Sequence, residues 1–217
     1  MTISDILGEL ARGLPITALL TVAGFVVGAV SAVPVAAARA SSITAVKTLA
    51  VAYIEIARGI PPIVWLFLLY FGLNQFGIQL ESIAAAILGL GIISAAYLSE
   101  IYRSGLASVP AGQLEAAQAL SLSRMTAFVR VTLPQAIVTI VPLATAFFIG
   151  LLKDSAIASV IGVQEITTAA LSLSRRTFDG LTIFVLCGLV YLVISLPISV
   201  LGRWLGNRLA QQWTVAR

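Results

Sequence analysis

Long apolar stretches separated by short polar intervals make up most of the sequence. A helix needs about 20 mostly apolar residues to cross the hydrocarbon core of a bilayer, and five stretches between charged residues are close to or above this length. The pattern therefore predicts an all-α, polytopic membrane protein whose residues 1–217 form a single transmembrane domain. The expected spans cover about residues 13–38, 51–73, 82–102, 131–152 and 180–202.

Gly59, Pro61 and Pro62 interrupt the second expected span. Proline removes a backbone donor and breaks helices, and irregular backbone at membrane depth is tolerated only beside protein or a water-filled cavity. Glu55 and Arg58 precede the break and lie three residues apart, so they can pair on one face of a helix. The segment is a candidate element of a translocation pathway. The alternative is a structural kink near the membrane interface, with both charged side chains in solvent.

The longest polar-containing interval between two apolar stretches covers about residues 110–130. Pro110 suits a first helical turn, and a helical pattern runs from there to Leu120. The residues Ser121-Leu122-Ser123 then predict a turn, with Ser123 as the N-cap of a second helix. We therefore expect a helix, a bend and a second helix at the membrane surface. Small alanines would let a partner approach closely, and Glu115 and Arg124 would be polar anchors.

The composition agrees with a membrane protein. Hydrophobic residues make up 59% of the chain and charged residues 10%, whereas soluble domains have roughly 25% charged residues. The mean hydropathy is +1.05, so lipid must be the main solvent of this chain. The net charge of +4 comes from loop residues, and the clustered basic face that nucleic-acid binding needs is absent.

Lys and Arg are divided unevenly between the two sides of the expected membrane. If the C-terminus is inside, the inner side holds twice as many of them as the outer side. The positive-inside rule therefore predicts a multi-pass protein of the cytoplasmic (inner) membrane with its N-terminus outside and its C-terminus inside. The inner set is Arg39, Lys47, Arg103, Arg124, Arg130, Arg203, Arg208 and Arg217, and the outer set is Arg12, Lys153, Arg175 and Arg176.

Several kinds of chemistry lack their residues in this sequence. It has no His and one cysteine, Cys187, in an apolar run, so no intrachain disulfide and no Ser-His or Cys-His arrangement can form. The phosphate-binding motif G-x-x-x-x-G-K-[ST] and the motifs CxxC and HExxH are also absent. We therefore expect no enzymatic activity, no metal site and no cofactor bound to this chain.

Residues 115–134 carry a spaced motif: Glu115-Ala116-Ala117, three residues, Ser121, nine residues and then Val131-Thr132-Leu133-Pro134. It resembles the EAA loop of bacterial ABC importer permeases, which has Gly in place of Ser121 and Ile in place of Val131. In those permeases the loop forms a cytoplasmic coupling helix that docks into a groove of the ATP-hydrolysing subunit. The resemblance implies that this stretch contacts the ATPase, through Glu115, Ala116, Ala117, Ser121 and Arg124. Ser121 costs backbone freedom if the bend needs a positive φ.

Other segments are similar to the polar amino acid subfamily of these permeases: Tyr53–Pro61, Ala96–Arg103, Leu151–Ser155 and Ser159–Val163. The resemblance covers most of the chain and implies a type I ABC importer transmembrane domain. It also implies four kinds of partner: ABC ATPase subunits that carry Mg-ATP, a second permease subunit in a homodimer or heterodimer, an extracytoplasmic solute-binding protein, and the lipid bilayer. The implied solute is a polar amino acid. Opines, compatible solutes and sulfur-containing amino acids are alternatives.

Ionisable residues at membrane depth are the expected contacts of the solute. Asp154 and Lys153 could face the two charges of a zwitterionic solute, or they could form a solvated pair at the interface. Glu100 could face an amino group or pair with Arg103, three residues later. The resemblance adds Ile60, together with Glu55 and Arg58, to the expected pathway. The subfamily usually has Thr in place of Ile60, so one polar side chain is missing here.

Two further expectations concern the segment before the last span and the class of transporter. Residues 162–179, with Arg175 and Arg176, should lie outside and meet the binding protein, or form a solvated loop that holds an interfacial helix. The alternative class is a secondary carrier that works alone, which would need coupling-ion ligands near the bilayer midplane and usually inverted repeats. Five spans do not divide into equal halves, and the first, fourth and fifth have no charged residue in mid-span. The pattern therefore favours a permease subunit over a carrier.

Overall fold

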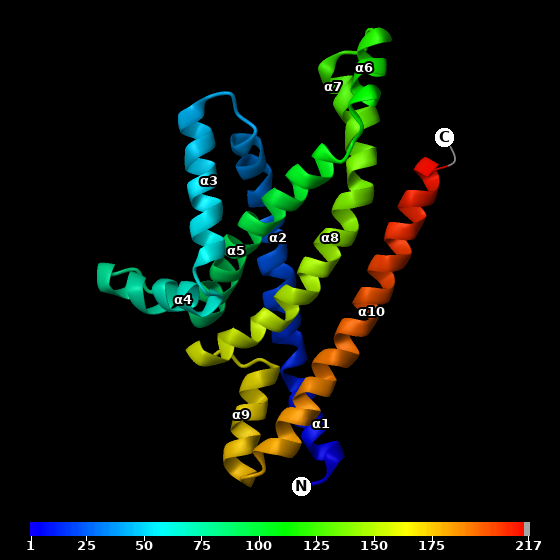
Figure 1. Ribbon diagram of the computed structural model, residues 1–217. Helices are drawn as coiled ribbons and strands as arrows, with labels where there is room; N and C mark the ends of the chain where they lie inside the picture. The colour runs from blue at the N-terminus through cyan, green and yellow to red at the C-terminus, as the bar shows by residue number, and fades with distance from the viewer. Residues whose placement is uncertain (215–217) are drawn as a thin grey trace.

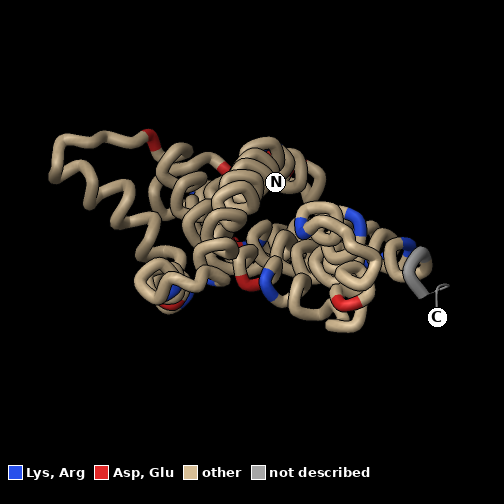
Figure 2. The backbone as a smooth tube through the Cα atoms, turned by 90° about the horizontal axis from the view of Figure 1, so that it is seen from above, with Lys and Arg blue, Asp and Glu red and all other residues tan. Residues whose placement is uncertain are grey.

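The computed structural model describes the backbone of residues 1–214 and the side chains of residues 1–211. Within these residues all regular structure is helical and no strand occurs (Figure 1). Four helical segments are long and apolar enough to cross a membrane, and two helices that meet at a sharp bend form a fifth crossing if they count as one span. Charged residues are sparse along the backbone (Figure 2). The all-α, polytopic fold expected from the sequence is confirmed.

The chain begins with a short helix that covers one end of the bundle. α1 (Ile3–Arg12) starts with a capping box, in which Thr2 N donates to Asp5 Oδ2 at 2.8 Å and Asp5 N donates to Thr2 Oγ1 at 3.3 Å. Its buried residues Ile6 and Leu10 pack in one apolar cluster with residues of α9 (Ile166–Thr177). The first span, α2 (Leu14–Arg39), follows directly after Gly13.

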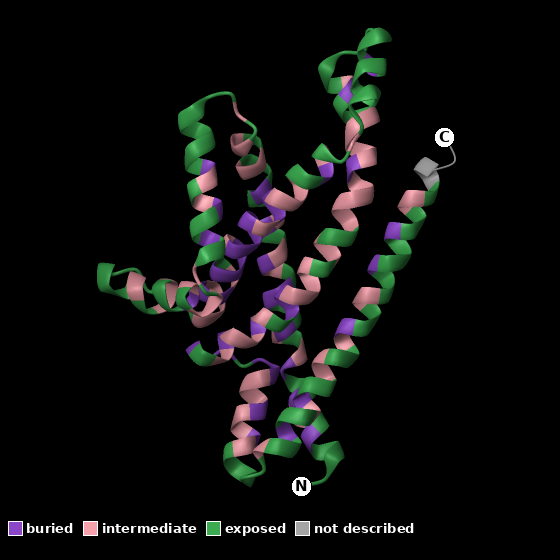
Figure 3. Ribbon diagram, in the orientation of Figure 1, coloured by how far each residue is buried: buried purple, intermediate pink, exposed green. Residues whose placement is uncertain are grey.

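α5 (Ser82–Ala107) is the central helix and the most buried of the spans (Figure 3). It packs along α2, where Gly24 and Gly28 allow the two backbones to approach closely. A Cβ atom on Gly24 would stand 2.9 Å from Leu90 Cβ, and a Cβ atom on Gly28 would overlap Ser94. These two glycines therefore determine how closely α2 and α5 pack.

The second expected span is not a continuous helix over residues 51–73. Its first part is α3 (Thr44–Gly59), and the chain then turns by 102° into α4 (Pro62–Phe67), η1 (Leu68–Gly72) and η2 (Leu73–Phe76). Ile60 and Pro61 have extended backbone, with ψ of 129° and 140°, because each precedes a proline, which disfavours helical conformation in the residue before it. As a result α4 projects sideways from the bundle (Figure 1).

α5 and α10 (Gly180–Thr214) extend past the expected ends of their spans, and α8 (Leu133–Asp154) begins and ends two residues later than expected. α6 (Ala111–Ala119) is followed by a bend, and the chain continues through α7 (Arg124–Ala127), η3 (Phe128–Thr132), α8 (Leu133–Asp154), η4 (Ser155–Ile161), α9 and α10 (Gly180–Thr214). The expected ends at 102, 152 and 202 each stand directly before a charged residue, Arg103, Lys153 or Arg203. Those ends were too early, because a charged residue near a helix end can keep helical backbone while its charged group extends toward water.

Different elements occupy the two ends of the bundle (Figure 1). α6 and α7, the start of α3 and the end of α10 lie at one end, which we call the α6 end. The N-terminus, α1 and α9 lie at the opposite end, which we call the α9 end. Arg217, one of the cations expected inside, lies outside the described residues.

Candidate functional site

α6 and α7 stand beyond the rest of the bundle at the α6 end (Figure 1). Their main packing is against each other and η3. Leu114, Leu120 and Met125 are 47%, 74% and 71% exposed there. A cluster of exposed large apolar side chains at the tip of a projecting element is typical of a surface that binds another protein.

The bend between α6 and α7 is closed by local hydrogen bonds. Ser121 N donates to Gln118 O at 2.8 Å and Leu122 N donates to Ala117 O at 3.1 Å. Ser123 is the N-cap of α7, because its Oγ accepts from Thr126 N at 3.2 Å. Ser121 has a φ of +53°, the left-handed conformation that glycine adopts without steric cost. The bend thus needs a positive φ at the position where the EAA pattern has Gly.

The predicted coupling residues do not all face outward. Glu115, Ala116 and Arg124 are exposed, as is Ser121 in the bend. Ala117 is only 3% exposed, so its side chain supports the bend and is not part of the exposed surface. Sequence spacing alone could not separate the two alanines, because the helix is too short for a clear apolar face.

Two side-chain pairs connect the α6 end to α8. Gln135 Nε2 donates to Gln113 Oε1 at 3.3 Å and to Val131 O at 3.0 Å. Ser108 Oγ and Thr139 Oγ1 are 2.9 Å apart. Gln113 of α6 and Ser108, the C-cap of α5, thus both contact α8, the helix that ends in Lys153 and Asp154.

Glu100 pairs with two arginines from different helices. Its Oε2 accepts from Arg103 Nη2 at 2.8 Å and from Arg103 Nε at 3.0 Å, and Arg39 Nε lies 3.6 Å from its Oε1. The pair with Arg103 is the alternative that the sequence spacing had offered, whereas Arg39 of α2 was not expected. Glu100 Oε1 is buried and has no hydrogen-bond partner among the described residues, so it can still accept a donor.

The possible pair of Glu55 with Arg58 is not formed. Glu55 has no ion pair among the described residues, and the guanidinium carbon of Arg58 lies 4.9 Å from the ring centroid of Tyr97. Tyr97 is also stacked on Phe147 of α8, with 5.3 Å between the centroids. Tyr97 is thus the neighbour of a candidate site residue, and the sequence analysis did not single it out because nothing in the sequence indicates which ring a cation will contact.

The other expected pathway residues lie at the break after α3 and at the end of α8. Ile60 lies in the break between α3 and α4, and Leu66 of α4 packs in one apolar cluster with Leu151 of α8 and Ile161 of η4. Lys153 is exposed and Asp154 is half-buried, and no ion pair joins them within the described chain. Glu100 thus lies with Arg39 and Arg103, Ile60 lies in the break after α3, and Asp154 lies at the end of α8.

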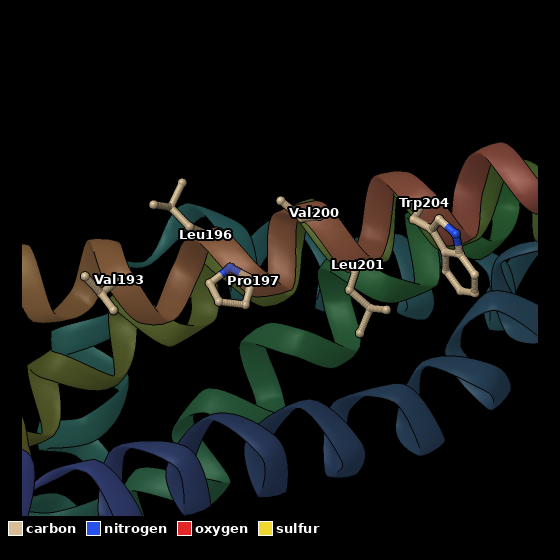
Figure 4. Close-up of a pocket in the computed structure, with 6 residues that line it drawn as sticks. All are labelled: Val193, Leu196, Pro197, Val200, Leu201 and Trp204. Carbon is tan, nitrogen blue, oxygen red and sulfur yellow. The ribbon is translucent and has the colours of Figure 1, made fainter.

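The bundle also has an exposed apolar face along α10. A shallow depression there is lined by Val193, Leu196, Pro197, Val200, Leu201 and Trp204 (Figure 4). Only 17% of the apolar windows of α8 and α10 is buried, against 61% for α5. In the described part of the chain no three His, Cys, Asp or Glu residues lie close enough to hold a metal ion.

The chain is similar to known proteins in both sequence and structure. Residues 24–211 match the family described as "binding-protein-dependent transport system inner membrane component". A probable amino-acid ABC transporter permease protein of Bacillus subtilis (strain 168), YckA, is 36% identical over 183 residues, which is 84% of this chain and 81% of the relative. The nopaline transport system permease protein NocM of Agrobacterium fabrum (strain C58) is 34% identical over 209 residues, 90% of this chain and 87% of the relative. A solved structure of an amino acid ABC transporter with histidines is 35% identical, with a TM-score of 0.88 over 96% of this chain and 100% of that chain.

Proposed function

This chain belongs to the family of binding-protein-dependent transport system inner membrane components, and we propose that it forms part of the solute pathway of an ABC importer for a polar amino acid. The observation that supports this most is the exposed α6–α7 element, which combines the spacing of the EAA loop with a left-handed residue at its bend. The chain is a permease subunit, and ATP hydrolysis belongs to a separate ATPase subunit that carries Mg-ATP.

In this proposal the ATPase binds the exposed tip formed by α6 and α7. Glu115 and Arg124 provide polar contacts, and Leu120 and Met125 provide apolar contact area. ATP binding brings two ATPase subunits together, and the tip moves with them. The Gln113–Gln135 and Ser108–Thr139 contacts transmit the displacement to α8, whose other end carries Lys153 and Asp154.

The α6 end is proposed to face the cytoplasm, with the N-terminus outside and the C-terminus inside the cell. This orientation is supported by the inner excess of Lys and Arg and by the position of α1 and the end of α10 at opposite ends of the bundle (Figure 1). Arg175 and Arg176 in the last turn of α9 would then lie outside, where an extracytoplasmic binding protein delivers the solute.

The solute is proposed to pass the break at Ile60 and the end of α8. There Asp154 would face the ammonium group of a zwitterion and Lys153 its carboxylate, and the group around Glu100, Arg58 and Tyr97 would meet it closer to the α6 end. An opine is the second candidate, because the relative NocM is named for nopaline transport. Compatible solutes and sulfur-containing amino acids are further alternatives.

A second permease subunit would complete the pathway. The exposed apolar surfaces of α8 and α10, including the depression of Figure 4, leave room for such a subunit beside lipid. That subunit is a second copy of this chain in a homodimer or a homologue in a heterodimer, and in a heterodimer the solute could contact only one of the two chains.

The proposal is tested by reconstituting the permease with its ATPase and binding protein in proteoliposomes and measuring ATP-driven uptake of radiolabelled polar amino acids. Glu115→Arg should abolish uptake and co-purification of the ATPase. Glu81→Arg, which changes an exposed carboxylate outside α6 and α7, should do neither. Normal uptake and normal co-purification of the Glu115→Arg protein would refute the coupling role.

Sidedness has its own test. Cys187, the only cysteine, is buried, so a Ser121→Cys protein has one exposed thiol. A membrane-impermeant maleimide should label that thiol in inverted vesicles and leave it unlabelled in intact cells. Labelling from outside intact cells would place the bend on the wrong side of the membrane.

A further inference from the structure

Glu165 is a fully buried carboxyl group that the proposed transport mechanism does not use. It is 0% exposed, and it is the only acidic or basic residue among the buried residues of the described chain. It lies outside the spans, between η4 and α9, and it is the N-cap of α9. The neighbouring apolar cluster contains Leu10 of α1, Ile166 of α9 and Ile183 of α10.

The two carboxyl oxygens of Glu165 contact two different helices. Oε1 accepts from Thr168 N at 2.7 Å, which caps the first turn of α9. Oε2 accepts from the hydroxyl of Tyr191, in α10, at 2.9 Å, and Thr167 Oγ1 lies 3.1 Å from the same hydroxyl. The next residue connects the site to a third helix, because Ile166 N donates to Thr17 Oγ1 of α2 at 3.3 Å.

A buried carboxyl group at the N-cap of α9 costs more free energy than a neutral N-cap side chain would. Burying a carboxylate without a cation costs much free energy, and no Lys or Arg pairs with Glu165 in the described chain. Ser, Thr or Asp would cap the helix equally well. What the longer Glu side chain adds is the hydrogen bond to Tyr191, which a Ser, Thr or Asp side chain is too short to make from the same position.

The charged groups on the surrounding elements do not interact with Glu165. On α1, Glu9 pairs with Arg12 at 2.7 Å and Asp5 accepts from Thr2. On α10, the titratable groups that interact electrostatically with Glu165 are Tyr191 and Cys187. Burial raises the pKa of the Glu165 carboxyl above its ordinary value, although its hydrogen bonds act in the opposite direction.

The position of Glu165 connects this contact to the proposed solute site. η4 runs from Ser155 to Ile161 and joins Asp154 to the start of α9. Ile161 and Ala158 of η4 pack with Leu66 of α4 and Leu151 of α8. A shift of α9 relative to α10 would therefore pull on η4 and displace Asp154 relative to the break at Ile60.

We propose that Glu165 is a positioning residue for transport. Its carboxyl group locks α9 to α10, so that the α9 end moves as one body with α10 and holds η4 and Asp154 in place beside the pathway. The lock consists of Glu165, Thr168 and Tyr191. This inference rests on the proposed function, because it assigns Asp154 to the solute pathway.

The lock is tested first without any transport. Amide hydrogen–deuterium exchange of the purified permease in nanodiscs should be faster in α9 for Glu165→Ala by at least about tenfold. A factor of ten corresponds to about 1.4 kcal/mol, the contribution of about one hydrogen bond, and this variant loses the hydrogen bonds from both Thr168 and Tyr191. Tyr191→Phe should accelerate it less, because the cap on Thr168 is retained. Glu165→Gln should restore slow exchange, since its amide can accept from Thr168 N and donate to Tyr191.

The second measurement is the number of ATP molecules hydrolysed per solute taken up by the reconstituted complex. Glu165→Ala should raise this ratio at least several-fold, and Glu165→Gln should restore it. Glu81→Ala is the matched control, because Glu81 is the N-cap of α5 but is exposed and makes no side-chain cap hydrogen bond. It should change neither measurement.

Two results would overturn the inference. Unchanged exchange of α9 in Glu165→Ala would show that no lock exists. Faster exchange with an unchanged ATP-to-solute ratio would show that the contact stabilises the fold without positioning the pathway. The exchange measurement needs only the permease, so it tests the lock even if the native complex shows no ATP-driven uptake, a result that would refute the proposed function instead.

Discussion

The close contact of α2 with α5 gives a prediction with a calculable size. Gly28→Ala adds one methyl group at a place where it would overlap Ser94 on the facing helix. Carbon atoms in contact need about 3.5–4.0 Å, so the two helices must separate locally. Overpacking of this kind costs about 1–3 kcal/mol, and the higher helix propensity of Ala returns about 1 kcal/mol. We therefore expect a net loss of up to about 2 kcal/mol.

Two other helical glycines, Gly24 and Gly188, allow the size of the steric overlap to be varied. Gly24→Ala places its Cβ 2.9 Å from Leu90 Cβ, so it should destabilise the protein less than Gly28→Ala. Gly188 of α10 has no atom within 4 Å of an added Cβ, so Gly188→Ala keeps only the propensity gain. Since 1 kcal/mol shifts the Tm by roughly 2–4 °C in a chain of this size, a thermal unfolding curve of the purified permease separates the three variants.

Gly28→Ala should also weaken the contact between Arg39 and Glu100, which joins the same two helices at 3.6 Å. The reasoning is refuted if Gly28→Ala melts at a higher temperature than the native protein. It is also refuted if Gly188→Ala lowers the Tm as much as Gly28→Ala does, because the loss would then not come from the α2–α5 contact.

Three further predictions concern single groups. Leu120→Arg should weaken ATPase binding about 10–100-fold in a pull-down titration, since burying a Leu contributes about 1.5–3 kcal/mol. Leu181, which is 81% exposed at the α9 end, provides the control, and Leu181→Arg should bind the ATPase normally. Equal losses of binding in the two variants would contradict the proposed contact of Leu120 with the ATPase. Burial raises the pKa of Glu165 above its ordinary value of 4.5, so the protonated carboxyl group contributes its full stability below pH 4.5, and this contribution is lost as the pH rises through the raised pKa. Over that pH range the Tm of the native protein should fall more than the Tm of Glu165→Gln, and parallel curves of Tm against pH would contradict this prediction. Arg58→Met should lower the Tm by the amount that corresponds to a cation–π contact of about 0.5–2 kcal/mol, and Tyr97→Leu should lower it more, because Tyr97 is also stacked on Phe147. The double variant should lose less than the sum of the two losses, and full additivity would rule the contact out.

Much of the fold could be predicted because its causes are local. A run of about 20 apolar residues needs a bilayer whatever its neighbours are, and the residues before Pro61 and Pro62 avoid helical backbone for steric reasons. The N-cap at Ser123 likewise depends on residues within one turn. The ends of the spans were less well predicted, because Arg103 and Lys153 remain helical, and the 102° angle after α3 is decided by the packing of α4.

The site divides in the same way. The sequence by itself determined the α6–α7 element, for which we propose the coupling role, since the EAA spacing, the helix before the bend and the N-cap after it all lie within about 20 neighbouring residues. Only the tertiary structure decided that Arg58 contacts Tyr97 and not Glu55, that Arg39 joins Glu100, and that Glu165 reaches Tyr191. In each of these contacts the partner lies on a different helix. Which helices become neighbours is set by close packing, as at Gly28 against α5, and not by separation along the chain.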